Sequence, residues 1–269
     1  MSRSTRLAGR QVRRAVTWAM GRLRPVAPPG AWRAILAARS LVGRGPVVVA
    51  PAPRRALVVA PHPDDETIGC GGTLAGLAAR GTDVRVVIAT SGEASVAAPG
   101  AGASATAAAR RAEATAACAV LGVPPPTFLG LPDGALEDHV GQLATLLATE
   151  VAGLDPQAIF VPWPLDDHPD HRAVPAALAR IEVRPDVEIW GYEVWSALPA
   201  NRIVDVSASW DTKVRALACH AAAHGTFDPS AHLALQRWRS LFGLDGRGHA
   251  EAFLVMGVDD LRQVLAEDR

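Results

Sequence analysis

The chain of 269 residues has few cysteines and no long apolar run. Its three cysteines, Cys70, Cys118 and Cys219, are scattered and lack the paired spacing of a structural zinc site. They also form no disulfide framework, which indicates a reducing compartment. No stretch approaches the roughly 20 consecutive apolar residues of a membrane-spanning helix. These absences argue against disulfide-stapled and membrane-spanning proteins and predict a cytoplasmic protein.

Acidic residues are absent from residues 1–55, which contain 12 arginines. The rest of the chain holds all 27 acidic residues against 15 basic ones (27 minus the 12 arginines), although the whole chain has zero net charge. We therefore predict a basic N-terminal arm over residues 1–53 and one domain over residues 54–269. Part of the arm has amphipathic helical spacing, which is compatible with peripheral membrane contact or with packing on the acidic domain. Arginines interrupt its apolar stretches, so a secretory signal is not expected.

Apolar residues make up 49% of the chain, enough for a sizeable core. From residue 56 onward, short apolar runs typical of buried strands alternate with amphipathic or alanine-rich stretches typical of helices. This alternation predicts a single α/β domain, Rossmann-like, with a mostly parallel sheet and helices on both faces. The expected strands are residues 56–60, 83–89, 127–129, 158–162, 187–195, 203–206 and 253–256. The expected helices are residues 67–80, 107–121, 139–154, 173–181, 210–223 and 236–242, with a short helix from residue 259.

The first chemical motif is the sequence PHPDDE, which contains His62, Asp64, Asp65 and Glu66. It directly follows the predicted strand of residues 56–60. Acidic residues at the start of the next helix would suit the helix dipole and cap free backbone N–H groups. Capping alone explains one or two acids, but it does not explain a histidine between two prolines beside three carboxylates.

The second motif is the sequence HPDHR, in which His168, Asp170 and His171 follow the predicted strand of residues 158–162. A single His-x-x-His pair is weak evidence, because histidines also serve as structural groups. Two His/Asp clusters, each just past a buried strand, are stronger evidence. The carboxyl ends of the strands form the ligand crevice of an open α/β sheet, so we expect the two motifs to meet there.

The chemistry that uses these residue types is metal-assisted hydrolysis. A catalytic zinc takes three protein ligands, commonly imidazole nitrogens and carboxylate oxygens, and keeps one position open. The two motifs offer His62, one of Asp64 and Asp65, and one of His168 and His171. One carboxylate and one imidazole then remain beside the metal as a candidate general base and general acid.

Together, PHPDDE and HPDHR resemble the PIG-L/LmbE family of zinc-dependent N-deacetylases, and the resemblance runs over residues 56–256. Weaker matches include the stretches around Lys213 and Glu251. By motif position, the resemblance implies that zinc is held by His62, Asp65 and His171. Another divalent metal is compatible with the same ligands.

The resemblance also implies catalytic roles. Asp64 would be the general base. His168, oriented by Asp170, would protonate the leaving amine or stabilise the oxyanion. Three further positions match the family and are expected to bind substrate. They are Glu93, Arg110 and Asp133.

The function implied by the resemblance is removal of an acetyl group from an N-acetylglucosamine-type substrate, either a small sugar conjugate or a glycolipid. No nucleic-acid partner is expected, and a homo-oligomer is compatible with the sequence. Two alternatives stay open: hydrolysis of an ester or phosphate bond, and a non-catalytic domain that binds a glycan or lipid. Trp163, Trp190 and Trp195 are candidates for stacking on a sugar, although we expect them to pack in the core.

Overall fold

The computed structural model describes residues 45–94, 102–221 and 228–267. The amphipathic part of the predicted arm up to residue 44 and residues 222–223 of the helix predicted over residues 210–223 lie outside the described residues. Within the described part of the chain, no helix is long and apolar enough to cross a membrane.

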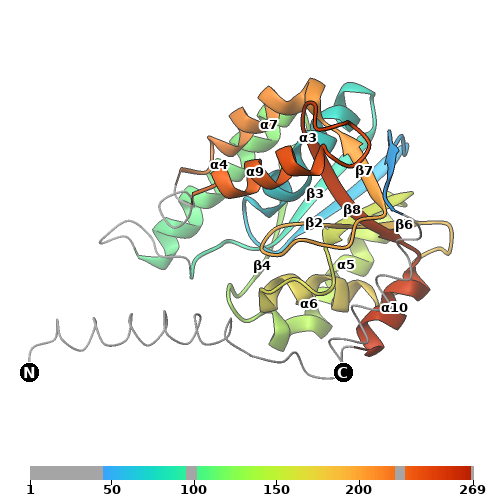
Figure 1. The fold of residues 1–269 in the computed structure, drawn as a ribbon. Helices are drawn as coiled ribbons and strands as arrows, with labels where there is room; N and C mark the ends of the chain where they lie inside the picture. The colour runs from blue at the N-terminus through green and yellow to red at the C-terminus, as the bar shows by residue number, and fades with distance from the viewer. Residues whose placement is uncertain (1–44, 95–101, 222–227, 268–269) are drawn as a thin grey trace, which may run out of the picture.

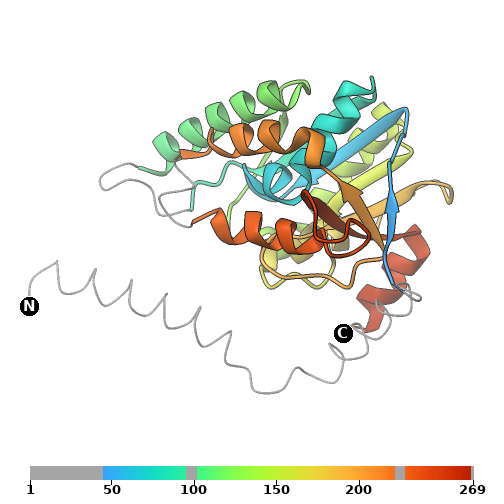
Figure 2. The same cartoon turned by 45° about the horizontal axis from the view of Figure 1, so that its top comes forward.

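An eight-stranded sheet forms the centre of the fold, in the order β1-β7-β8-β6-β5-β2-β3-β4 (Figure 1). All neighbouring pairs are parallel except those of β8, which runs antiparallel to β6 and β7. Figure 2 shows β1 at one edge of this sheet. The strands are β1 (Val47–Val49), β2 (Arg55–Ala60), β3 (Asp83–Thr90), β4 (Thr127–Leu131), β5 (Ala158–Pro162), β6 (Glu188–Tyr192), β7 (Arg202–Asp205) and β8 (Ala250–Met256).

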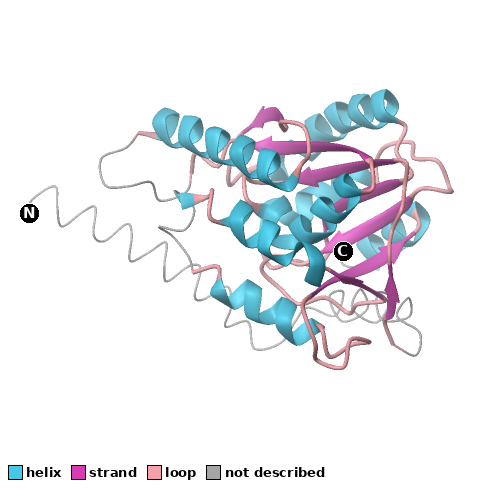
Figure 3. Ribbon diagram, turned by 90° about the horizontal axis from the view of Figure 1, so that it is seen from above, coloured by secondary structure: helices cyan, strands magenta, loops and turns pink. Residues whose placement is uncertain are grey.

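Helices cover both faces of the sheet, and Figure 3 shows the strands lying side by side beneath one helical layer. Helices α3 (Asp65–Ala79), α4 (Ala103–Leu121), α7 (Trp210–Leu217) and α9 (Ser230–Arg239) lie on one face. Helices α5 (Val140–Leu154), α6 (Pro169–Leu178) and α10 (Val258–Glu267) lie on the other. Each layer buries its own apolar cluster against the sheet. The predicted fold class is therefore confirmed.

Two differences from the predicted elements have physical causes. Strand β1 lies within residues 1–53, which were predicted to form an arm, and pairs with β7 at the sheet edge. It is only three residues long, and so short an apolar run does not predict a strand. Helix α6 begins at Pro169 rather than Ala173, because His168 acts as its N-cap and proline suits the first helical position. The histidine pair of the second motif therefore lies on the first turn of a helix.

Helix α3, which carries the first motif, is interrupted at Cys70, whose φ of −141° and ψ of 16° are not helical. An interruption leaves backbone N–H and C=O groups without helical partners. Glu251 of β8 accepts the N–H groups of Gly72 and Thr73, both at 2.8 Å. Lys213 of α7 donates to the carbonyl of Ile68 at 2.7 Å and to Glu251 at 2.5 Å.

Two glycines let α3 approach the sheet closely. A Cβ atom on Gly69 would lie 2.2 Å from Cδ2 of Tyr192, and one on Gly72 would lie 2.7 Å from Cβ of Val206. Side chains at these positions would push the helix away. This close packing holds the helix that begins in the first motif against the sheet.

Lys213→Met is expected to lower the free energy of unfolding by roughly 3–5 kcal/mol, because it leaves the fully buried Glu251 carboxylate without its counter-charge. Urea denaturation measures the change. Arg215→Met removes an exposed charge from the same helix and should change stability by no more than about 0.5 kcal/mol. Equal effects of the two substitutions would contradict a structural role for the Lys213–Glu251 pair.

Candidate metal centre and active site

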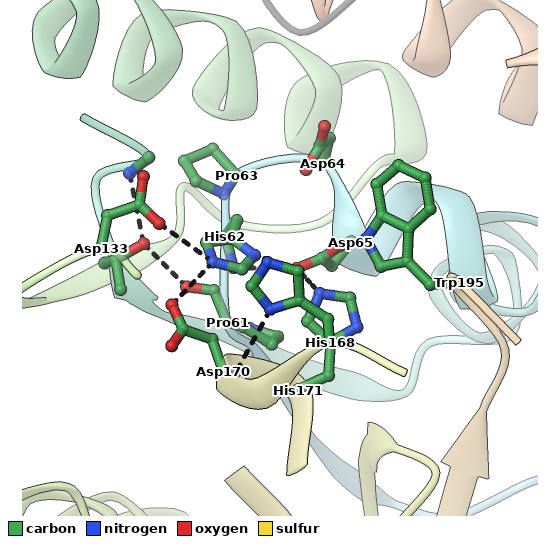
Figure 4. A network of polar contacts seen from close by, with 12 residues as sticks. Pro61, His62, Pro63, Asp64, Asp65, Asp133, His168, Asp170, His171 and Trp195 are labelled. Carbon is green, nitrogen blue, oxygen red and sulfur yellow. Dashed lines mark hydrogen bonds and ion pairs between the residues drawn. The ribbon is translucent and has the colours of Figure 1, made fainter. Parts of the chain in front are cut away.

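The two predicted motifs lie together at the carboxyl ends of neighbouring strands. The first follows β2 and the second follows β5, and these strands pair in parallel. Figure 4 shows His62 and Asp65 of the first motif gathered with His168, Asp170 and His171 of the second, while Asp64 lies apart from this group. The sheet therefore brings together residues about a hundred positions apart in sequence, as predicted from the strand ends.

His62, Asp65 and His171 form a buried cluster whose candidate ligand atoms lie within 4.8 Å of one another. Nδ1 of His62 lies 3.0 Å from Oδ2 of Asp65, and Nε2 of His171 lies 3.3 Å from the same oxygen. Both nitrogens thus face one carboxylate oxygen. Two imidazoles and one carboxylate form a donor set that suits a catalytic zinc.

The charges around these imidazoles favour a cation. Burial acts to lower the pKa of His171, but the Asp65 and Asp166 carboxylates raise it to about 9. Burial likewise opposes a charge on His62, whereas Asp133, Asp170 and Asp65 raise its pKa well above the usual value. His171 has carboxylates within 3.3 Å of both ring nitrogens, yet neither nitrogen has an aligned hydrogen bond. A buried Nε2 without such a bond, facing Asp65, fits a metal ligand.

The far side of the His62 ring faces two more carboxylates. Nε2 of His62 lies 3.1 Å from Oδ1 of Asp133 and 3.1 Å from Oδ2 of Asp170. Asp170 also accepts the N–H groups of Gly134 and Leu136, at 2.7 and 3.0 Å, which fix its orientation. A carboxylate on the outer nitrogen orients a histidine ligand and increases its basicity.

The structure corrects the expected partner of Asp170. Its carboxylate contacts His62, whereas only its backbone N–H reaches His168, donating to Nδ1 at 3.1 Å. Because Nδ1 accepts this bond, the neutral His168 ring carries its proton on Nε2. Burial and the neighbouring imidazoles His171 and His62 lower the pKa of His168 to about 4. His168 is therefore a neutral hydrogen-bond donor in this arrangement.

Asp64 adopts a backbone conformation that is unusual for a residue other than glycine, with φ of 127° and ψ of −27°. Such strain is often found at functional sites. Its backbone N–H donates to Glu66 at 3.2 Å, and Oδ1 of its carboxylate pairs with Arg110 at 3.1 Å. Burial raises the pKa of Asp64 to about 8 against the lowering effect of Arg110, with Asp65 and Glu66 adding to the rise. A carboxylate that accepts a proton near neutral pH suits a general base.

The three residues expected to bind substrate contact the protein itself. Arg110 is 5% exposed and also donates to the carbonyl of Pro63 at 2.7 Å. Glu93 accepts the N–H of Asp133 at 3.0 Å, and Asp133 accepts the N–H of Ala94 at 2.7 Å. These bonds join the loops after β3 and β4 and hold Asp133 against the candidate metal ligand His62.

The three tryptophans considered for sugar stacking differ in exposure. Trp163 and Trp190 are buried in the core, as expected. Trp195 is 36% exposed and lies at the edge of the His/Asp cluster in Figure 4. The expectation of core packing was therefore wrong for Trp195, because it follows the end of β6 in a loop.

Asp166 is a site residue that sequence reasoning did not identify. Its carboxylate lies 3.1 Å from Nδ1 of His171. It precedes His168 in the stretch DDHPDH, where Asp167 is an equally plausible candidate. Only the conformation of the loop shows that Asp166 points inward while Asp167 is exposed.

The sheet topology and the buried His/Asp cluster define an α/β protein with a candidate divalent-metal site, and comparisons with known proteins give its family. Residues 57–181 match the PIG-L family, described as GlcNAc-PI de-N-acetylase. A 1D-myo-inositol 2-acetamido-2-deoxy-alpha-D-glucopyranoside deacetylase from Mycobacterium sp. (strain KMS) is 30% identical over 227 residues. That alignment covers 62% of this chain and 73% of the relative.

Two solved structures are similar to this fold. The conserved protein TT1542 from Thermus thermophilus is 31% identical with a TM-score of 0.60, covering 74% of this chain and 92% of that one. The N,N'-diacetylchitobiose deacetylase from Pyrococcus horikoshii has a TM-score of 0.62 at 23% identity, covering 77% and 85%. The chain belongs to the PIG-L family, and proteins of this family are metal-dependent.

Proposed function

We propose that the chain is a zinc-dependent hydrolase that removes an acetyl group from an N-acetylglucosamine-type substrate. The observation that carries the proposal is the buried cluster of His62, Asp65 and His171, with the His168 ring beside His62. Asp64 is buried and directly precedes Asp65 in the chain. Zinc held by these three ligands would polarise the acetyl carbonyl and lower the pKa of a water molecule. Other divalent metals fit the same donor set.

The remaining residues supply proton transfer and charge stabilisation. Asp64 takes a proton from the attacking water, since it precedes the candidate ligand Asp65 in the chain and burial raises its pKa to about 8. Nε2 of His168 carries a proton and donates a hydrogen bond to the oxygen on which negative charge develops. The proton that Asp64 accepted from water then passes to the nitrogen of the departing amine as the C–N bond breaks. Arg110 keeps Asp64 in place through the 3.1 Å ion pair.

The relatives support an amino-sugar substrate. The Mycobacterium relative is described as a deacetylase of an N-acetylated glucosaminyl inositol, and the Pyrococcus protein as a deacetylase of diacetylchitobiose. Trp195 is partly exposed at the edge of the cluster, where an aromatic side chain suits contact with a sugar ring. The basic residues 1–55 are compatible with a lipid-linked form of the substrate at a membrane surface.

A substrate panel tests the bond that is cleaved. We expect acetate release from N-acetylglucosaminyl conjugates and much slower reaction with matched O-acetyl esters and phosphate monoesters. Release of phosphate or of ester-linked acetate in preference to amide-linked acetate would favour the alternative hydrolases. Tight binding of a conjugate without turnover by the zinc-loaded protein would favour the non-catalytic alternative.

Peripheral membrane contact predicts binding to vesicles that contain anionic lipids and weaker binding to neutral vesicles. Co-sedimentation at low and high salt measures this, because attraction between arginines and anionic lipids is screened by salt. The control is the chain without residues 1–44, which keeps β1. Equal sedimentation of the two chains would show that the arm does not bind these vesicles.

A further inference from the structure

Asp166 is a buried acidic residue that the proposed reaction does not use. It lies in the loop between β5 and α6 and is 1% exposed. Oδ1 lies 3.1 Å from Nδ1 of the candidate metal ligand His171 and accepts the backbone N–H of His168 at 3.0 Å. A buried carboxylate is costly unless its oxygens have partners. We therefore ask what the contact between Asp166 and His171 contributes to the site.

The orientation of the Asp166 carboxylate is set by the backbone. Oδ2 accepts the N–H groups of Trp195 and Ser196, at 3.1 and 3.3 Å, in the loop after β6. Together with the bond from His168, three backbone donors hold the two oxygens. Oδ1 is consequently a fixed acceptor beside the His171 ring, and the same carboxylate ties the second motif to the loop that carries Trp195.

A neutral imidazole binds a metal through the nitrogen without a proton, so its other nitrogen must carry the proton. In His171, Nε2 faces the shared oxygen of Asp65, and Nδ1 lies 3.1 Å from Oδ1 of Asp166. The Nδ1 contact is not an aligned hydrogen bond, so Asp166 acts on the ring through its charge at short distance. We infer that Asp166 is a positioning residue that holds His171 in the metal-binding tautomer. This inference rests on the metal site of the proposed function.

Asp166→Asn keeps the size and shape of the side chain but removes its charge. It therefore tests whether the carboxylate sets the tautomer of His171. The amide oxygen can replace Oδ2 as acceptor for the N–H groups of Trp195 and Ser196. The amide NH₂ group then faces Nδ1 of His171 and favours the tautomer with its proton on Nε2, so that Nε2 cannot bind a metal. The same NH₂ group cannot accept the backbone N–H of His168, so that bond is lost as well. We expect the zinc affinity of Asp166→Asn to fall 10–100-fold, the range typical for removal of such an outer partner.

The experiment measures zinc affinity of the full chain by competition with a chromophoric chelator. Asp167→Asn is the matched control, because it removes the same charge from the adjacent, exposed position. Asp166→Glu keeps a carboxylate and is expected to bind zinc more tightly than Asp166→Asn. Thermal unfolding of each protein without zinc and with saturating zinc separates metal binding from stability.

The inference predicts that Asp167→Asn matches the wild-type chain, while Asp166→Asn binds zinc 10–100-fold more weakly and gains less thermal stability from it. Wild-type zinc affinity in Asp166→Asn would overturn the inference and leave the metal site standing. A lower unfolding midpoint without zinc, at unchanged zinc affinity, would also overturn it by showing a purely structural role. Should Asp166→Asn not fold, Asp166→Ser decides, because it removes the carboxylate: weaker zinc binding than wild type supports the inference, and an unchanged zinc affinity overturns it. A wild-type chain that binds no zinc would overturn the inference and the proposed function together.

Discussion

Asp64→Asn is expected to lower kcat by about 10²–10⁴-fold while zinc stays bound, because removal of a positioned general base costs that much. The amide keeps the size of the side chain and cannot accept the proton of the attacking water. The candidate zinc ligands, His62, Asp65 and His171, are unchanged in this variant. Acetate release under saturating substrate measures kcat, and metal analysis of the same sample measures bound zinc.

The control for Asp64→Asn is Asp167→Asn, which removes an exposed carboxylate outside the cluster and should leave kcat unchanged. Asp64 also pairs with Arg110, so the unfolding midpoints of both variants are compared to exclude loss of the fold. Near-normal turnover in Asp64→Asn would show that another group is the base. Glu66, whose pKa burial raises to about 7, would then be the next candidate.

His62→Ala is expected to abolish both zinc binding and acetate release. It removes one of the three candidate ligands and leaves the Asp65, Asp133 and Asp170 carboxylates facing one another without the imidazole between them. The loss of zinc affinity should exceed the 10–100-fold typical of removing only an outer partner. Metal analysis after gel filtration, together with acetate release at saturating zinc, measures the two effects.

His139→Ala is the matched control for His62→Ala. His139 is half-buried, and its ring bonds the backbone carbonyl of Ala135 at 2.9 Å rather than a carboxylate of the cluster. This variant should bind one zinc per chain and keep wild-type acetate release. Retention of zinc by His62→Ala at wild-type affinity would show that the metal lies elsewhere.

Much of the site could be predicted from strand ends and residue types. The buried runs before PHPDDE and HPDHR placed both motifs at carboxyl ends of strands, and parallel pairing of β2 with β5 brings them together. The spacing of apolar residues and the alanine-rich composition of several stretches also predicted the helices on both faces of the sheet. These features depend on local sequence, which is why sequence reasoning reaches them.

The partners of individual side chains could not be predicted in this way. Asp170 lies close to His168 in sequence, yet its carboxylate contacts His62 because the N–H groups of Gly134 and Leu136 hold it there. Lys213 and Glu251 appeared only as weak family matches, and their role depends on the interruption of α3 at Cys70. Such contacts join segments that are distant in sequence, so spacing carries no signal for them.

Acetate release before and after removal of the metal tests the central claim most directly. The protein is treated with a chelator, freed of it, and assayed on an N-acetylglucosaminyl conjugate with and without added zinc. We predict that release stops on chelation and returns with about one zinc per chain, as a site built from His62, Asp65 and His171 requires. Unchanged release by protein shown to hold no divalent metal would contradict a metal-dependent deacetylase.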